Sequence, residues 1–186
     1  MQLIGLSGYA RSGKDEAALA LMKSGYERIA FADKLRDFLY ALNPIVGVVE
    51  PYIYGPVKMI RLQEVIDHYG WDGYKETPYV DEIRPLLQRL GTEAGRQTLW
   101  DSLWIDAAMH DLNQDGKYVV TDCRFINEAD AIRNLGGTVV RISRFGIGPA
   151  NSHASETSLD DYRFDFNVAN DGTIEEFHHL VRSVFL

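Results

Sequence analysis

A single cysteine, Cys123, occurs among the 186 residues, so no intramolecular disulfide can form, which fits a reducing compartment. The sequence also lacks an apolar run that approaches the roughly eighteen residues of a membrane-spanning helix, and its first residues do not resemble a secretory signal. Lys and Arg number 19 against 27 Asp and Glu, which gives a formal charge of −8. This acidic balance disfavours general binding to nucleic acid or anionic membranes, although it allows a local basic pocket. We therefore expect a cytoplasmic protein without nucleic-acid or membrane partners.

What the sequence does contain is a regular alternation of strand and helix patterns. Its length fits a single domain over residues 1–186 that buries a core of its own. The expected strands are residues 2–7, 26–31, 118–122, 138–142 and 164–169. Strands that alternate with helices favour an α/β fold with a doubly wound, five-stranded parallel sheet and helices on both faces. Ligands of such sheets bind at the carboxyl ends of the strands.

Capping and breaking residues set the expected helix ends. Asp33 is placed as the N-cap of a helix that Asn43-Pro44 ends, Pro85 opens another helix that Gly91 stops, and Thr173 with Glu176 forms a capping box. Residues 45–81 are rich in Pro, Gly and Tyr and form an expected insertion with one amphipathic helix ending at Gly70. Residues 143–157 are expected to form a lid-like irregular loop, in which His153 has a structural role.

The first strand leads into GYARSGKD, a glycine-containing loop with a lysine at its end and a helix behind it. Such a loop turns backbone N–H groups and a helix N-terminus toward phosphate oxygens, which Lys14 reaches as a point charge. The usual Ser or Thr after the lysine is replaced by Asp15, whose carboxylate is an equally hard ligand for Mg²⁺. The alternative is a glycine turn capped by Asp15. The predicted ATP-binding residues are Gly8, Ala10, Arg11, Ser12, Gly13, Lys14, Asp15 and Arg144.

A second polar group follows the third expected strand, where Asp122 and Arg124 lie two residues apart. Asp122 is typical of a second Mg²⁺ anchor, and the alternative is a cap for the helix expected at Asn127. Arg124 is a candidate phosphate clamp, and the alternative is an ion pair with a neighbouring acid.

Five blocks of the sequence together resemble the deoxynucleoside monophosphate kinases of tailed bacteriophages. They are GLSGYARSGKD, FADKLRDFLYAL, RPLLQRLGTEAGRQTLWDSLW, VVTDCRFINEADAIRNLGGTVVRISR and HASETSLDDYRFDFNVANDGTIEEF. The resemblance leaves only residues 45–81 poorly covered, and GKD in place of GKS or GKT is typical of that family. It implies a P-loop kinase fold and the transfer of the γ-phosphoryl group of ATP, with Mg²⁺, to a deoxynucleoside monophosphate.

In such a transfer the attacking phosphate oxygen is already ionised, so positioning and charge neutralisation suffice and no general base is needed. Lys14, Arg124 and Asp122 are the expected catalytic residues, with Asp15 and Asp122 as metal ligands. The expected acceptor-binding residues are Asp33, Lys34, Arg36, Trp71, Gln88, Arg124 and Glu128.

Two other classes of function stay open. One is a kinase for another small phosphate, such as phosphomevalonate or dephospho-coenzyme A, and the other is a nucleotide-controlled switch without transfer activity. A guanine-specific switch is disfavoured because the sequence has no Asn-Lys-x-Asp stretch and no glycine three residues after Asp122. We also expect a homodimer that uses the tyrosine-rich insertion.

Overall fold

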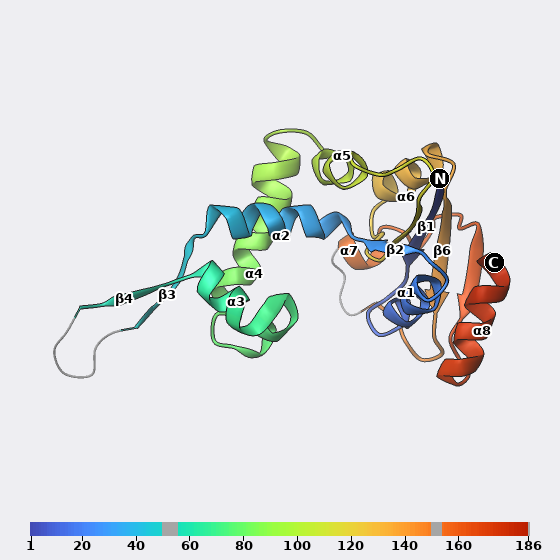
Figure 1. Cartoon of the computed structure of the whole chain (residues 1–186), viewed down its shortest axis with the longest axis horizontal. Helices are drawn as coiled ribbons and strands as arrows, with labels where there is room; N and C mark the ends of the chain where they lie inside the picture. The colour runs from blue at the N-terminus through green and yellow to red at the C-terminus, as the bar shows by residue number, and fades with distance from the viewer. Residues whose placement is uncertain (50–55, 150–153, 186) are drawn as a thin grey trace. The chain divides into compact units, whose positions relative to one another are not determined.

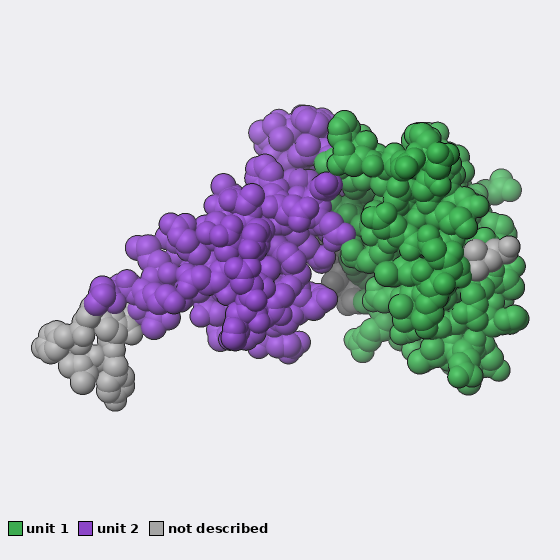
Figure 2. Space-filling view, in the orientation of Figure 1, with its two compact units in different colours: residues 1–31, 105–186 green, residues 32–104 purple. Residues whose placement is uncertain are grey.

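The computed structural model describes residues 1–49, 56–149 and 154–185, and it divides into two compact units (Figure 1, Figure 2). Unit 1 consists of Met1–Phe31 and Ile105–Leu186, and unit 2 consists of Ala32–Trp104. The expected insertion at residues 45–81 therefore lies inside unit 2. Among the described residues, no helix has both the length and the apolar character needed to cross a bilayer.

Unit 1 is built on a parallel sheet of five strands in the order β2-β5-β1-β6-β7. The strands are β1 (Gln2–Ser7), β2 (Glu27–Ile29), β5 (Lys117–Val120), β6 (Thr138–Ser143) and β7 (Phe166–Ala169). The central strand β1 pairs with β5 on one side and with β6 on the other, so its carboxyl end has a neighbour on both sides. The prediction of a five-stranded parallel sheet is confirmed.

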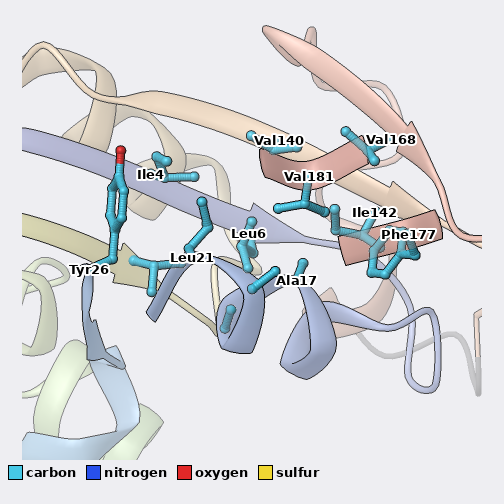
Figure 3. Close-up of a cluster of buried hydrophobic side chains, with 13 residues drawn as sticks. Ile4, Leu6, Ala17, Leu21, Tyr26, Val140, Ile142, Val168, Phe177 and Val181 are labelled. Carbon is cyan, nitrogen blue, oxygen red and sulfur yellow. The ribbon is translucent and has the colours of Figure 1, made fainter. Parts of the chain in front are cut away.

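Alternate side chains of β1 enter two different cores. Ile4 and Leu6 pack with Leu21 of α1 (Lys14–Met22) and with Phe177 of α8 (Ile174–Phe185), as Figure 3 shows. Leu3 points to the opposite core, which contains side chains of α5 (Leu103–Met109) and α6 (Ile126–Asn134). This alternation with a period of two places helices on both faces of the sheet, as the sequence predicts.

Unit 2 contains helices and a two-stranded antiparallel ribbon. Its elements are α2 (Phe31–Leu42), which begins at the last residue of unit 1, β3 (Ile45–Val49), β4 (Lys58–Arg61), α3 (Leu62–Gly73), the short 3₁₀ helix η1 (Tyr74–Glu76), α4 (Val80–Arg89) and the π-helix η2 (Leu90–Gln97). Leu39, Val46, Leu62 and Ile83 form the centre of its core. The ribbon of β3 and β4 was not predicted, because Gly47 interrupts the apolar alternation there.

Three expected helix boundaries are wrong. Asp33 is not an N-cap, since α2 already begins at Phe31. Pro85 lies inside α4, whose first turn carries Asp81 and Glu82 instead. Gly91 does not stop the chain's helical path, which continues as η2.

The capping box at the start of α8 is confirmed. The Thr173 N–H donates to Glu176 Oε2 at 2.8 Å, and the Glu176 N–H donates to Thr173 Oγ1 at 3.3 Å. These two bonds satisfy donors that a helix N-terminus otherwise leaves without partners. The expected lid-like loop contains the short helix α7 (Ala154–Thr157), while His153 lies outside the described residues.

Asp165, just before β7, joins the sheet to α6. Its Oδ2 accepts the Val139 N–H at 2.8 Å, and its Oδ1 accepts a bond from Arg133 Nη2 at 2.8 Å. Partial burial would raise the pKa of this carboxyl, but the hydrogen bonds from Val139 and Arg133 outweigh it and hold the pKa below its ordinary value. The ionised carboxylate therefore stabilises the fold.

We expect this contribution to be complete above about pH 4 and lost as the pH falls through the lowered folded pKa. In urea unfolding, the drop in the free energy of unfolding between pH 6 and pH 3 should be smaller for Asp165→Asn than for the wild type. Asp161→Asn, which removes a neighbouring exposed carboxylate, serves as the control and should keep the wild-type pH dependence. Equal drops for the wild type and Asp165→Asn would contradict the assignment.

Candidate functional site

The loop between β1 and α1 has a backbone that bends sharply three times. Gly8 and Gly13 have φ angles of 147° and 104°, and Arg11 has a φ of 66°. The Ser12 N–H donates back to Tyr9 O at 3.2 Å and closes the loop on itself. Ala10 and Arg11 are exposed at its tip, while Ser12 is completely buried. The strand, loop and helix follow one another as a phosphate-binding loop requires.

The loop leaves no room for a side chain at Gly8. A Cβ placed there would lie 2.3 Å from Ile142 O and 2.7 Å from Ser12 Oγ, and its φ would strain any L-residue. We expect Gly8→Ala to lower the free energy of unfolding by about 1–3 kcal/mol, visible as a lower thermal midpoint. Gly148→Ala, where an added Cβ meets nothing within 4 Å, should melt like the wild type. A wild-type midpoint in Gly8→Ala would show that the loop conformation differs.

Lys14 folds back over the loop that precedes it. Its Nζ donates to Gly8 O at 2.7 Å and to Tyr9 O at 2.8 Å. Burial lowers the pKa of the Lys14 ammonium, the Arg124 guanidinium lowers it further, and the carboxylates of Asp15 and Glu156 act in the opposite direction. An arriving anion would relieve this destabilisation of the charge, so the position favours phosphate.

The end of β5 holds two acids with structural contacts. Asp122 is half-buried, and its Oδ1 accepts the Phe31 N–H at the start of α2 at 2.9 Å. Glu128 is buried, and its Oε2 accepts the N–H of Arg124 at 2.7 Å and that of Phe125 at 3.1 Å. Asp122 thus accepts a hydrogen bond at the start of α2. The start of α6, which the sequence alternative assigned to Asp122, is bound by Glu128 instead. A role of Glu128 in acceptor binding stays a prediction.

Arg124 is held through its backbone and through its side chain. Glu128 fixes its backbone, while Glu156 of α7 accepts a bond from Arg124 Nη1 through Oε1 at 3.4 Å. About half of the Arg124 side chain is exposed, with a relative accessibility of 48% against 13% for Glu156. Arg124 therefore forms an ion pair, and the partner is Glu156, 32 residues away in the sequence, rather than the neighbouring acid that the sequence suggested. A guanidinium that is exposed and oriented in this way can still present donors to a phosphate.

The predicted metal ligands differ in exposure. Asp15 is exposed in the first turn of α1, and Asp122 is half-buried. Among the residues that the structure describes, no group of three or more His, Cys, Asp and Glu could hold a metal ion. Mg²⁺ in kinases is bound by one or two carboxylates with substrate phosphates and water, rather than by a cage of protein ligands. Two carboxylates beside a phosphate loop fit that donor set, and the metal site stays a prediction.

One polar cluster beside the loop was missed by the sequence analysis. Arg141, which lies beside Ser7 in the sheet, stacks on the Tyr9 ring at 4.3 Å and bonds to Asp160 at 3.1 Å. Tyr9 OH also donates to Asp160 Oδ1 at 2.6 Å, and this bond raises the pKa of the tyrosine. Arg144, which was predicted instead, is exposed in the turn after β6. The carboxyl end of β6 was the available signal for Arg141, but only the strand order places it next to Tyr9.

Unit 2 brings three predicted acceptor-binding residues together. Arg36 Nη1 lies 3.3 Å from Asp33 Oδ1, and its guanidinium carbon lies 5.9 Å from the centre of the Trp71 ring. Lys34 and Gln88 are exposed in α2 and α4. The cluster of Asp33, Arg36 and Trp71 thus combines a cation with an aromatic surface.

The matching family model and two sequence relatives carry the same family name. The family model described as deoxynucleotide monophosphate kinase matches residues 73–181. A protein of Acanthamoeba polyphaga mimivirus, which carries the provisional name of a deoxynucleotide monophosphate kinase, is 32% identical over 98% of this chain and 95% of its own. The deoxynucleotide monophosphate kinase of Escherichia phage RB69 is 30% identical over 55% of this chain and 44% of its own. A solved dephospho-CoA kinase from Campylobacter jejuni aligns over 99% of this chain and 96% of its own, with 12% identity and a TM-score of 0.46.

Proposed function

Because the chain belongs to the deoxynucleotide monophosphate kinase family, we propose that it transfers the γ-phosphoryl group of ATP to a deoxynucleoside monophosphate and forms the diphosphate. The observation that carries this proposal is the position of Lys14. Its ammonium lies on the phosphate loop within electrostatic reach of Arg124, so two cations from distant parts of the sequence serve one site. Two fixed cations at one phosphate site suit the transfer of a highly charged group.

On the donor side, the loop and the first turn of α1 bind the phosphates of ATP. Lys14 leaves the carbonyls of Gly8 and Tyr9 and takes phosphate oxygens in their place. Asp15 and Asp122 would hold Mg²⁺, which would neutralise charge on the phosphates. Arg144 binds the nucleotide from the turn after β6.

For the acceptor, unit 1 offers Arg124 as a cation for the phosphate of the monophosphate, and unit 2 offers Arg36. The ring of Trp71 offers its face to the base, and Asp33 orients Arg36 through their ion pair. Lys34 and Gln88 in unit 2 and Glu128 in unit 1 are further candidates for acceptor binding. The attacking oxygen is ionised near neutral pH, so the protein's task is to align two polyanions and exclude water.

The proposal is tested by following ADP production from ATP and Mg²⁺. The acceptors are the four deoxynucleoside monophosphates, their ribose counterparts, phosphomevalonate, dephospho-coenzyme A, and none. Turnover that requires a deoxynucleotide supports the proposal and gives the base specificity. Turnover with phosphomevalonate or dephospho-coenzyme A alone, or without any acceptor, would overturn it, and ATP binding without turnover would favour a switch.

We further propose a homodimer and a cytoplasmic location, which is the host cytoplasm if the chain comes from a phage. The support for a dimer is the ribbon of β3 and β4. Its apolar side chains Val48, Val49 and Met59 are 58%, 50% and 58% exposed. Exposed apolar side chains on a ribbon are suited to a second copy of the chain. A monomer mass in light scattering at micromolar concentration would refute the dimer.

A further inference from the structure

The residue directly after β7 reaches back to the phosphate loop. Asn170 Nδ2 donates to Ser12 O at 3.0 Å, although the two residues stand at opposite ends of the sequence. The Asn170 N–H donates to Ser143 O at 2.8 Å, which anchors its backbone to the end of β6. The side-chain amide is therefore held by the sheet rather than by a free loop, and its contact with Ser12 has a fixed direction.

This contact decides how one peptide group of the loop is turned. The Ser12–Gly13 peptide is planar and trans, so its carbonyl and its N–H point in opposite directions. When Asn170 holds the Ser12 carbonyl on one side, the Gly13 N–H must face the other side. A phosphate loop binds through such N–H groups, and a peptide turned the wrong way would present an oxygen that repels phosphate.

Packing makes the arrangement specific to this pair of residues. A Cβ on Gly13 would lie 2.2 Å from Asn170 Nδ2, so the amide occupies the space that the missing side chain leaves. Ser12 is fully buried while the amide is in place. Loss of the amide would leave a buried acceptor without its partner, and the peptide would gain by rotating toward another donor.

We propose that Asn170 is a positioning residue for the donor nucleotide, which orients the Gly13 N–H toward the phosphates by holding the Ser12 carbonyl. The inference rests on the proposed function only in taking the ligand of the loop to be a nucleotide polyphosphate. Asn170 acts through the loop backbone and touches no reacting atom.

The test compares Asn170→Leu, which keeps the size of the side chain without a donor or a charge, with Asn170→Ala. Asn167→Ala, an exposed amide in β7 three residues before Asn170, is the matched control. Calorimetry gives the dissociation constants of ATP and of inorganic tripolyphosphate, which carries the phosphates without base or sugar. All proteins are measured well below their thermal midpoints, so that each is folded.

Both Asn170 variants should bind ATP and tripolyphosphate roughly tenfold or more weakly, while Asn167→Ala binds like the wild type. The affinity for the monophosphate acceptor should change less than twofold. Wild-type affinity for tripolyphosphate in folded Asn170→Leu would overturn the inference, and so would an equal loss in Asn167→Ala. The binding measurements do not depend on phosphoryl transfer. A wild-type protein that binds ATP but phosphorylates no acceptor would therefore refute the proposed function, and the comparison of the Asn170 variants would still test this inference.

Discussion

Lys14→Met should reduce the turnover number for phosphoryl transfer by about a thousandfold, while the protein stays folded. Methionine keeps much of the length of the lysine chain but cannot neutralise charge on the transferring group. The two bonds that the variant loses, to Gly8 O and Tyr9 O, are bonds that the substrate must displace in any case. The loss should therefore appear in the turnover number more than in the thermal midpoint.

Single-turnover kinetics at saturating ATP and acceptor measure this effect without interference from product release. Lys23→Met, at the end of the same helix and exposed, is the matched control and should retain wild-type turnover. More than a tenth of the wild-type rate in Lys14→Met would mean that the ammonium is not part of the transfer site.

Arg124→Ala should reduce turnover to a similar extent, on the order of a thousandfold. The backbone of Arg124 stays in place, because Glu128 Oε2 holds its N–H independently of the side chain. The variant therefore removes the guanidinium and leaves the start of α6 as it is. Arg124→Lys should recover only part of the loss, since an ammonium cannot present the planar fork of donors.

The measurement is the same single-turnover assay, with thermal melting as the check on folding. Arg182→Ala in the last turn of α8 is the control for removal of an arginine from unit 1. Turnover within tenfold of the wild type in Arg124→Ala would show that the ion pair with Glu156 is the whole role of this side chain.

The parallel sheet and the phosphate loop could be predicted because their signals are local. The strands β1, β5 and β6 are largely apolar segments, and GYARSGKD lies between a strand and a helix with no need of distant contacts. The capping box of Thr173 and Glu176 is likewise complete within four residues.

The wrong helix boundaries have distant causes. The start of α2 lies at Phe31 because its N–H is accepted by Asp122, which is remote in sequence. Gly91 continues a helix because its carbonyl accepts Trp104 Nε1 at 3.0 Å, while its missing side chain leaves room for Leu35. Tertiary contacts of this kind override local propensity.

The polar neighbours of the loop were missed for a related reason. Arg141 and Asn170 reach the loop only because β6 lies next to β1 and β7 lies next to β6. Composition and periodicity give the existence of strands but not their order, and a residue at a strand end gains its partners from that order. Asp33 was named from the family resemblance, whereas Trp71 lies in the segment that the resemblance covers poorly and was named as a ring that could stack on a base. Their roles in acceptor binding stay predictions.

The insertion of unit 2 into unit 1 has a consequence for the order in which the chain folds during synthesis. Gln2 pairs with Lys117, so β1 has no partner until all of unit 2 has left the ribosome. Unit 2 is continuous and closes through short-range pairs such as β3 with β4, which are kinetically favoured over long-range ones. Unit 2 should therefore fold first, while β1 still lacks its strand partners. The phosphate loop would be completed only after β7 has emerged, because Asn170 follows that strand, and a ribosome-bound chain without β7 should bind ATP more weakly.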